Sequence, residues 1–122
     1  MENLSNIKIK ILDKEIASII IDESKTYNAL SFKNLGDLIK TFKKLDNNKR
    51  IKVIIIEGAG KGFSAGHNLK EVSGLKKKAK YQKLFNLCSK LMLQIVDGKK
   101  PVIAKVHGAA FAAGCQLVAS CD

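Results

Sequence analysis

The chain has 122 residues, of which 46% are hydrophobic and 27% charged, and its formal net charge is +11. This length fits one domain, and the apolar content is sufficient for a core, which excludes an intrinsically disordered chain. No stretch approaches the roughly 20 apolar residues that span a bilayer, and the polar opening Met1–Asn6 lacks the apolar segment of a secretory signal. We therefore expect no membrane span and a cytoplasmic location.

The positive charge is spread along the chain. Arg50 is the single arginine, and the lysines occur in every segment. A basic surface attracts phosphates, but a nucleic-acid-binding domain also needs aromatic side chains on which bases stack. The five Phe and two Tyr are scattered without a recognition motif. We therefore expect no nucleic acid as partner. The alternative hypothesis, a basic nucleic-acid-binding domain, predicts salt-dependent binding of DNA or RNA.

The first elements expected are a β-hairpin and a helix. Ile7–Ile11 alternates apolar and polar residues, and Ile16–Ile21 is a denser apolar run. Ser31 is a favourable N-cap before an amphipathic stretch, which predicts a helix over Phe32–Asp46 that ends at Asn47.

The second half of the chain predicts two further strands, each followed by a helix. Val53–Ile56 is continuously apolar, as in a strand covered on both faces, and a glycine-rich loop follows it. A long helix is expected over Ala79–Val96, a strand over Val102–Val106 and the start of a buried helix over Cys115–Cys121. This order predicts an α/β fold with mainly parallel strands and right-handed crossovers.

The cysteines Cys88, Cys115 and Cys121 are odd in number and form no Cys-x-x-Cys pair. This pattern disfavours a zinc site and a disulfide framework. We expect reduced, buried thiols and no metal.

Two strand-to-loop junctions carry the residues of chemical interest, Gly62–Glu71 and Gly108–Gln116. Each places backbone N–H groups at the carboxyl edge of a parallel sheet, where α/β folds usually bind ligands. The small residues Ala65 and Gly66 let a ligand approach the main chain, whose N–H groups can stabilise a carbonyl oxygen that becomes negative. A tight turn explains either junction alone equally well.

The two junctions together are a more specific signal than either one alone. Residues 63–71 read Phe-Ser-Ala-Gly-His-Asn-Leu-Lys-Glu and are similar to the crotonase segment F-S/C-A-G-x-D-L-K-E, and residues 107–117 are similar to its segment N-G-x-A-x-G-G-G-C-E-L. Residues 28–30 and 99–104 resemble its N-A-L and K-P-V-I-A motifs, in the same order. The whole chain thus resembles the N-terminal half of the crotonase (enoyl-CoA hydratase/isomerase) superfamily, and residues 112–122 point to its enoyl-CoA hydratase domain-containing protein 3 subgroup.

The resemblance implies the ClpP/crotonase fold, a ββα superhelix. Residues 1–122 would be the N-terminal portion of a single domain, truncated before its C-terminal part. The implied function is acyl-CoA binding in fatty-acid metabolism, in the lyase or isomerase class. It implies no cofactor other than the coenzyme A thioester, which is the substrate or ligand, and a homo-oligomer, a trimer or hexamer.

Position by position, the resemblance assigns an oxyanion hole to the backbone N–H groups of His67 and Ala113, with the imidazole of His67 incidental. The residues implied to line the substrate site are Ala65, Gly66, Asn68 and Leu69 beside the oxyanion hole, and Lys25 and Ala29 near the nucleotide end.

Several residues depart from the family pattern. Gln116 stands where hydratases have their first catalytic glutamate, and an amide cannot serve as general base. The second glutamate would lie beyond Asp122. Ala112 and Ala113 replace glycines, so their Cβ atoms fit only if φ stays negative, and Asn68 replaces the usual aspartate. Whether the chain is an enzyme is open; we expect no competent hydratase, and the alternative is a non-catalytic acyl-CoA-binding or oligomer-forming module.

Overall fold

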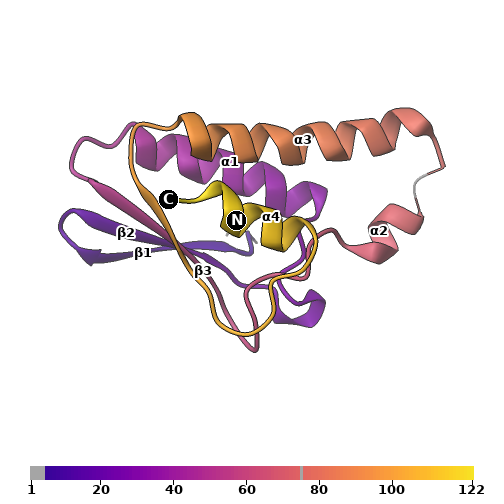
Figure 1. The fold of residues 1–122 in the computed structure, drawn as a ribbon, viewed down its shortest axis with the longest axis horizontal. Helices are drawn as coiled ribbons and strands as arrows, with labels where there is room; N and C mark the ends of the chain where they lie inside the picture. Colours follow the sequence, from indigo (N-terminus) through magenta and orange to yellow (C-terminus); the bar gives the residue numbers. More distant parts are fainter. Residues whose placement is uncertain (1–4, 75) are drawn as a thin grey trace.

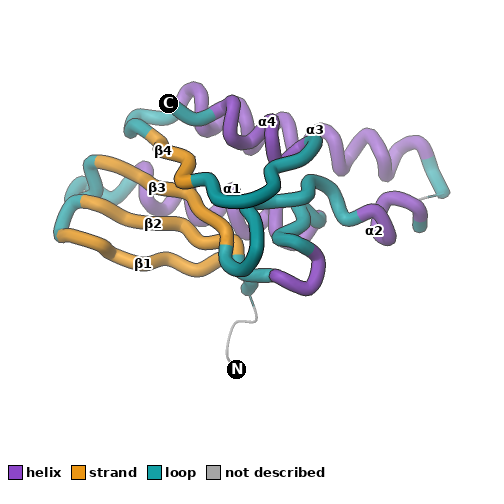
Figure 2. Tube along the Cα trace, turned by 60° about the horizontal axis from the view of Figure 1, so that its bottom comes forward, coloured by secondary structure: helices purple, strands orange, loops and turns teal. Residues whose placement is uncertain are grey.

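The structure is a computed structural model that describes residues 5–74 and 76–122. Its centre is a four-stranded sheet in the order β1-β2-β3-β4, with the strands side by side in Figure 2. The strands are β1 (Ile7–Asp13), β2 (Ile16–Ile21), β3 (Val53–Gly58) and β4 (Val102–Lys105). The β1–β2 pair is an antiparallel hairpin, and the β2–β3 and β3–β4 pairs are parallel. The predicted hairpin and parallel α/β arrangement are confirmed.

The helices are the 3₁₀ helix η1 (Ser24–Thr26), α1 (Phe32–Asp46), α2 (Leu69–Ser73), α3 (Lys78–Asp97) and α4 (Ala113–Ser120). The bounds of α1 are those predicted, because the Ser31 side chain accepts a hydrogen bond from the Asn34 N–H and caps the helix. Helices α1 and α3 lie side by side on one face of the sheet (Figure 1). The described residues contain no helix with the length and apolar character needed to cross a membrane.

The core lies between the sheet and the layer of α1 and α3. The sheet contributes Ile19, Ile54 and Ile56, and the two helices contribute Leu35, Leu38, Leu84 and Leu91, all of them buried. Leu117 brings α4 into the same cluster. The first residues of α4, and the loop before it, are therefore fixed by core packing.

Strand β3 is covered less completely than its continuous apolar sequence predicts. Ile54 and Ile56 are buried against the helices, whereas Val53 and Ile55 on the other face are only half-buried. Ile103 of β4, which pairs with Ile55, is 50% exposed. The prediction of cover on both faces is wrong for the described residues, because α1 and α3 lie on one side of the sheet.

Candidate functional site

The two predicted junctions lie side by side at the carboxyl ends of β3 and β4. We call residues 59–68 the first loop and residues 106–112 the second loop. Ser64 and Ala110 form an isolated parallel β-bridge between them. The Phe63 N–H donates to the Ala109 carbonyl oxygen at 2.9 Å, and the Phe111 N–H donates to the Ser64 carbonyl oxygen at 3.0 Å. The loops therefore behave as a short extension of the sheet.

Glycines allow the closest approach between the two loops. Gly66 has φ +90°, and a Cβ built on it would lie 3.0 Å from the Phe111 carbonyl oxygen and 3.1 Å from the Ala113 nitrogen. A Cβ on Gly114 would overlap the Ser64 carbonyl oxygen. The main chain at Gly66 thus packs directly against the start of α4, which a larger residue would push away.

The amides of His67 and Ala113 are the two groups to which the sequence assigned an oxyanion hole. Among residues 5–74 and 76–122, neither N–H donates a hydrogen bond to a protein acceptor. Ala113 is the first residue of α4, where helix N–H groups lack intrahelical partners and the helix dipole is positive. The neighbouring Gly66 is fixed, since its carbonyl oxygen accepts from the Leu30 N–H at 2.7 Å and its N–H donates to Ser64 Oγ at 3.2 Å.

The imidazole of His67 has its own contacts. Its Nδ1 lies 3.2 Å from the Leu30 carbonyl oxygen, and its ring meets the Phe85 ring edge-on with centroids 5.4 Å apart. These contacts hold the ring against α3 and the loop before α1. They give the imidazole a structural task that is separate from the backbone N–H.

Asn28 organises the first loop, a role that the sequence analysis did not assign. Its side chain is buried, and its Nδ2 donates to the carbonyl oxygens of Ala59 at 2.8 Å, Gly62 at 3.0 Å and Phe63 at 3.1 Å. Its own carbonyl oxygen accepts from Ser64 Oγ at 2.8 Å. Asn28 has φ +57°, a left-handed conformation that asparagine tolerates better than most residues. The resemblance of residues 28–30 to the N-A-L motif marked this position without indicating its structural role.

Ala112 departs from the geometry expected for it. Its φ is +50° and its ψ is −120°, a region that favours glycine, so the expectation of a negative φ is wrong at this position. Ala113, within α4, has no positive φ. The reason is the tight connection at the second loop, which must turn sharply so that the Gly114 N–H can donate to the Phe111 carbonyl oxygen at 2.7 Å.

The predicted nucleotide-end residues differ in exposure. Lys25 lies in η1 and lines a cavity of about 390 Å³ together with Lys61 of the first loop. Ala29 is 2% exposed, its N–H donates to Thr26 Oγ1, and its carbonyl oxygen accepts from Asn34 Nδ2. Ala29 is therefore placed to fix the loop, and its contact with a ligand stays a prediction.

The remaining predicted residues lie in the first loop or on the helices that follow the two loops. Ala65 lines a second cavity of about 190 Å³ with Ser64 and Phe111. Asn68 is the N-cap of α2, where its Oδ1 accepts hydrogen bonds from the N–H groups of Lys70 and Glu71, at 3.0 and 3.2 Å. Leu69 is 81% exposed, and Gln116 is exposed on α4. The short helix α2 was not predicted, although an N-cap asparagine preceded it.

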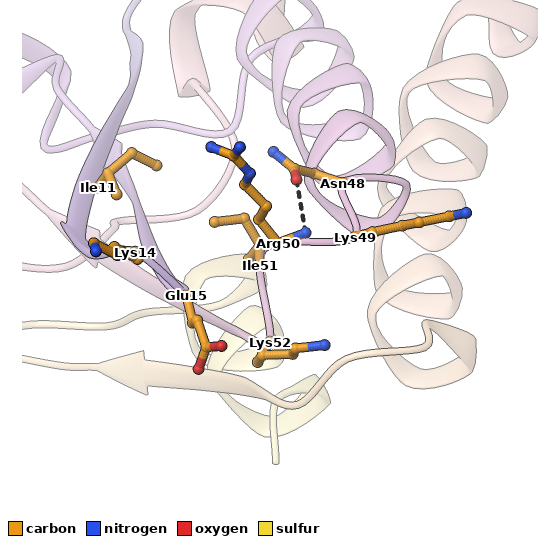
Figure 3. Close-up of a pocket in the computed structure, with 8 residues that line it drawn as sticks. All are labelled: Ile11, Lys14, Glu15, Asn48, Lys49, Arg50, Ile51 and Lys52. Carbon is orange, nitrogen blue, oxygen red and sulfur yellow. Dashed lines mark hydrogen bonds between the residues drawn. The ribbon is translucent and has the colours of Figure 1, made fainter.

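Another cavity, of about 760 Å³, lies at the opposite end of the sheet, where β2 and β3 begin. Its lining residues are Ile11, Lys14, Glu15, Asn48, Lys49, Arg50, Ile51 and Lys52. The charged ends of Lys14, Lys49 and Arg50 point in different directions in Figure 3. They do not converge on one point, as the groups of a specific anion site do, and the cavity is remote from both loops.

The three cysteines are free thiols in different surroundings. Cys88 is buried, and burial raises its pKa. Burial, with a smaller contribution from Asp122, raises the pKa of Cys121 to about 11. Cys115 is exposed on α4, so the expectation that all three thiols are buried is wrong there, because that side of the short helix faces solvent.

Comparison with known proteins shows what the chain is similar to. Residues 12–122 match the sequence profile described as Enoyl-CoA hydratase/isomerase. The chain is 41% identical, over 122 residues, to the mitochondrial enoyl-CoA hydratase domain-containing protein 3 of Xenopus laevis, covering 98% of this chain and 42% of the relative. The human protein of that name is 43% identical over 107 residues, covering 88% of this chain and 35% of the relative.

Solved structures of the same family have the same fold as this chain. The crystal structure of human enoyl coenzyme A hydratase domain-containing protein 3 superposes with a TM-score of 0.90 at 40% identity, and that of an enoyl-CoA hydratase from Mycobacterium smegmatis with 0.93 at 36%. Each match covers 97% of this chain and 46% of the solved chain. The crotonase-like fold expected from the sequence is confirmed, and the chain spans less than half the length of these proteins.

The cytoplasmic location expected from the sequence is contradicted. The relatives from Xenopus laevis, Danio rerio and Homo sapiens are named as mitochondrial proteins. The expectation rested on the lack of an apolar signal segment. That criterion detects secretory signals, whereas mitochondrial targeting segments are amphipathic and basic, so it had no power to exclude this location.

Proposed function

The chain belongs to the enoyl-CoA hydratase/isomerase family, and we propose that it binds an acyl-CoA thioester between the first and second loops. The thioester carbonyl oxygen accepts hydrogen bonds from the N–H groups of His67 and Ala113. The observation that carries the proposal is that these two amides lack acceptors within the described part of the chain, although the main chain beside both is tightly packed.

The chemistry suits these two donors. An enolate formed from a thioester concentrates negative charge on oxygen, and fixed N–H groups stabilise it without reorganising. Removing one such donor in other enzymes costs about 3 kcal/mol of activation free energy. The N-terminus of α4 adds a favourable dipole at the Ala113 N–H.

The phosphates of the ligand fit the other end of the site. Lys25 and Lys61 line the same cavity of about 390 Å³, where two ammonium groups offer point charges to phosphate oxygens. Among residues 5–74 and 76–122, neither lysine forms a salt bridge with a carboxylate. Their charges are therefore available to an anionic ligand.

Hydratase turnover is not part of the proposal for this chain. Gln116 supplies an amide where a general base is needed, and its side chain is exposed on α4. This residue favours a second candidate function, a non-catalytic acyl-CoA-binding module. A trimer or hexamer remains a proposal, supported by the half-open sheet face around Ile55 and Ile103.

Calorimetry with acetyl-CoA tests the binding site through Gly66. Gly66→Ala puts a Cβ against Phe111 and Ala113 at a positive φ, so we expect the affinity to fall at least roughly tenfold, about 1.4 kcal/mol. Gly36→Ala is the matched control, because nothing lies within 4 Å of the added Cβ in α1. Equal affinity in both folded variants would refute the proposed site.

A second pair of variants removes one donor alone. Ala112→Gly relaxes the backbone before α4, and Ala113→Pro in that background deletes the N–H at the first helical position, which proline tolerates. Acetyl-CoA should bind roughly three- to tenfold more weakly to the double variant, the value of one hydrogen bond. CoA has no acyl carbonyl and should bind both variants with equal affinity. An equal loss of CoA affinity in the double variant would contradict the proposed hydrogen bond from the Ala113 N–H to the acyl carbonyl.

A further inference from the structure

The end of the molecule opposite the two loops is strongly basic. The cavity of about 760 Å³ at this end is lined by one carboxylate, that of Glu15, and by four cationic side chains, those of Lys14, Lys49, Arg50 and Lys52. Among residues 5–74 and 76–122, none of the four cations forms a salt bridge with a carboxylate. All four are exposed, so their charge acts on the solvent in front of the cavity.

Exposed aliphatic side chains lie beside these charges. Ile11 lines the same cavity and is 55% exposed, and the next residue, Leu12, is 48% exposed. The register of the β1–β2 pair shifts between Ile11 and Asp13, where Leu12 is the extra residue of a bulge on the edge strand. Neither aliphatic residue is part of the core cluster that the described residues form. We call the whole group the basic tip, which consists of Ile11, Leu12, Lys14, Lys49, Arg50 and Lys52.

The main chain fixes the two segments of the basic tip to each other. The Lys52 N–H donates to the Glu15 carbonyl oxygen at 2.7 Å, which joins the α1–β3 connection to the hairpin. Within the connection, the Arg50 N–H donates to Asn48 Oδ1 at 3.0 Å (Figure 3). Ile51, between the two cations, is 3% exposed and anchors the connection in the core. The aliphatic and cationic groups therefore form one surface on a fixed frame.

The arrangement of this surface indicates the kind of partner that it fits. Its charged ends point in different directions, which suits an extended anionic surface better than a single anion (Figure 3). A bilayer with anionic lipids is such a surface and attracts nearby Lys and Arg side chains, while aliphatic groups beside them enter the interface below the head groups. Nucleic acid is also an extended anion, but the lining residues that the structure describes include no aromatic ring on which a base could stack.

From these observations we propose that the basic tip binds peripherally to anionic membrane surfaces. Its four cations lie against the lipid phosphates, and its two aliphatic side chains enter the lipid interface. This contact is independent of the proposed acyl-CoA binding, because the two loops lie at the other end of the sheet. The loops then stay open to a dissolved ligand while the protein is bound to the bilayer.

Co-sedimentation with vesicles tests the electrostatic part of the contact. The chain should bind vesicles of equal parts phosphatidylcholine and phosphatidylglycerol, and it should not bind vesicles of phosphatidylcholine alone. Lys49→Gln combined with Arg50→Gln should lower the partition coefficient at least roughly tenfold, because both cations face the anionic lipid. Circular dichroism should show the same fold for this double variant and for the wild-type chain.

Lys80→Gln combined with Lys83→Gln is the matched control. It removes two exposed charges and gives the same net charge, but from the start of α3, which lies at the other end of the molecule from the β1–β2 hairpin in Figure 1. This control should bind the anionic vesicles as the wild-type chain does. Equal losses in the two double variants would overturn the proposal, because net charge and not the basic tip would then govern binding.

Tryptophan fluorescence tests the aliphatic part, because the chain contains no tryptophan. The emission of Leu12→Trp should shift to the blue on the anionic vesicles, since the indole leaves water for the interface. The emission of Leu93→Trp, at a 59% exposed position on α3, should stay unchanged. Vesicle binding without a shift for Leu12→Trp would refute the insertion of the hairpin. Binding of a single-stranded RNA without binding of the vesicles would refute the membrane as partner and favour nucleic acid.

Discussion

Replacing Ala112 by glycine should stabilise the protein. Ala112 has φ +50° and ψ −120°, and it is exposed, so its methyl group loses little apolar burial when removed. A non-glycine residue held in such a region costs about 1–3 kcal/mol. The added freedom of glycine in the unfolded chain offsets about 0.5–1 kcal/mol of that gain. We expect the free energy of unfolding to rise by about 1 kcal/mol.

Urea denaturation followed by circular dichroism at the helix band measures this change. In a thermal melt followed by the same signal, a rise of about 1 kcal/mol in the free energy of unfolding should move the midpoint upward by about 3–5 °C for a chain of this size. The slope of the free energy against urea should stay constant, since the surface exposed on unfolding hardly changes.

Ala113→Gly is the matched control, one residue along the chain. Ala113 is buried and within α4, without a positive φ, so glycine there should lower stability by about 1–2 kcal/mol through lower helix propensity and the loss of a buried methyl group. Each substitution removes one methyl group, but the two positions differ in backbone conformation and in burial. If Ala112→Gly also lowers stability, the strain attributed to Ala112 does not exist.

Other predictions follow from the site. The chain should leave the conjugated absorbance of crotonyl-CoA unchanged, because Gln116 offers no general base, and turnover at an ordinary enzyme rate would refute that reasoning. Asn28→Ala should lower the free energy of unfolding by about 3 kcal/mol, measured in urea, since it removes the Nδ2 donor from three carbonyl oxygens of the first loop, of which that of Phe63 is buried. At pH 8 a thiol reagent should label Cys115 first, because burial raises the pKa of Cys88 and that of Cys121, the latter to about 11. Intact mass should show one label per native chain, and two or three at the earliest times would contradict the burial.

The regular elements were predictable because their signals are local. The Ser31 cap and the apolar spacing after it define α1 at both ends, and the alternation in Ile7–Ile11 defines β1. The neighbouring position of the two loops also followed from the sequence, since parallel strands end at one edge of a sheet.

The features that could not be predicted from the sequence depend on tertiary contacts. Ala112 takes a positive φ because the Phe111 carbonyl oxygen must meet the Gly114 N–H, which no property of alanine indicates. The role of Asn28 arises from carbonyl groups more than thirty positions away in the chain. The exposure of Cys115 depends on which side of α4 packs on the core, and a short helix has little periodicity from which to predict it.

The bridge between Ser64 and Ala110 has a consequence for how ligand and folding are coupled. It joins distant parts of the chain, so the pair of loops exists only after β3, β4 and α4 have assembled. A ligand held there binds the native chain and not the unfolded one, so it raises the free energy of unfolding by RT ln(1 + [ligand]/Kd). With the proposed acyl-CoA bound, the protein should therefore resist proteolysis longer than it does without the ligand.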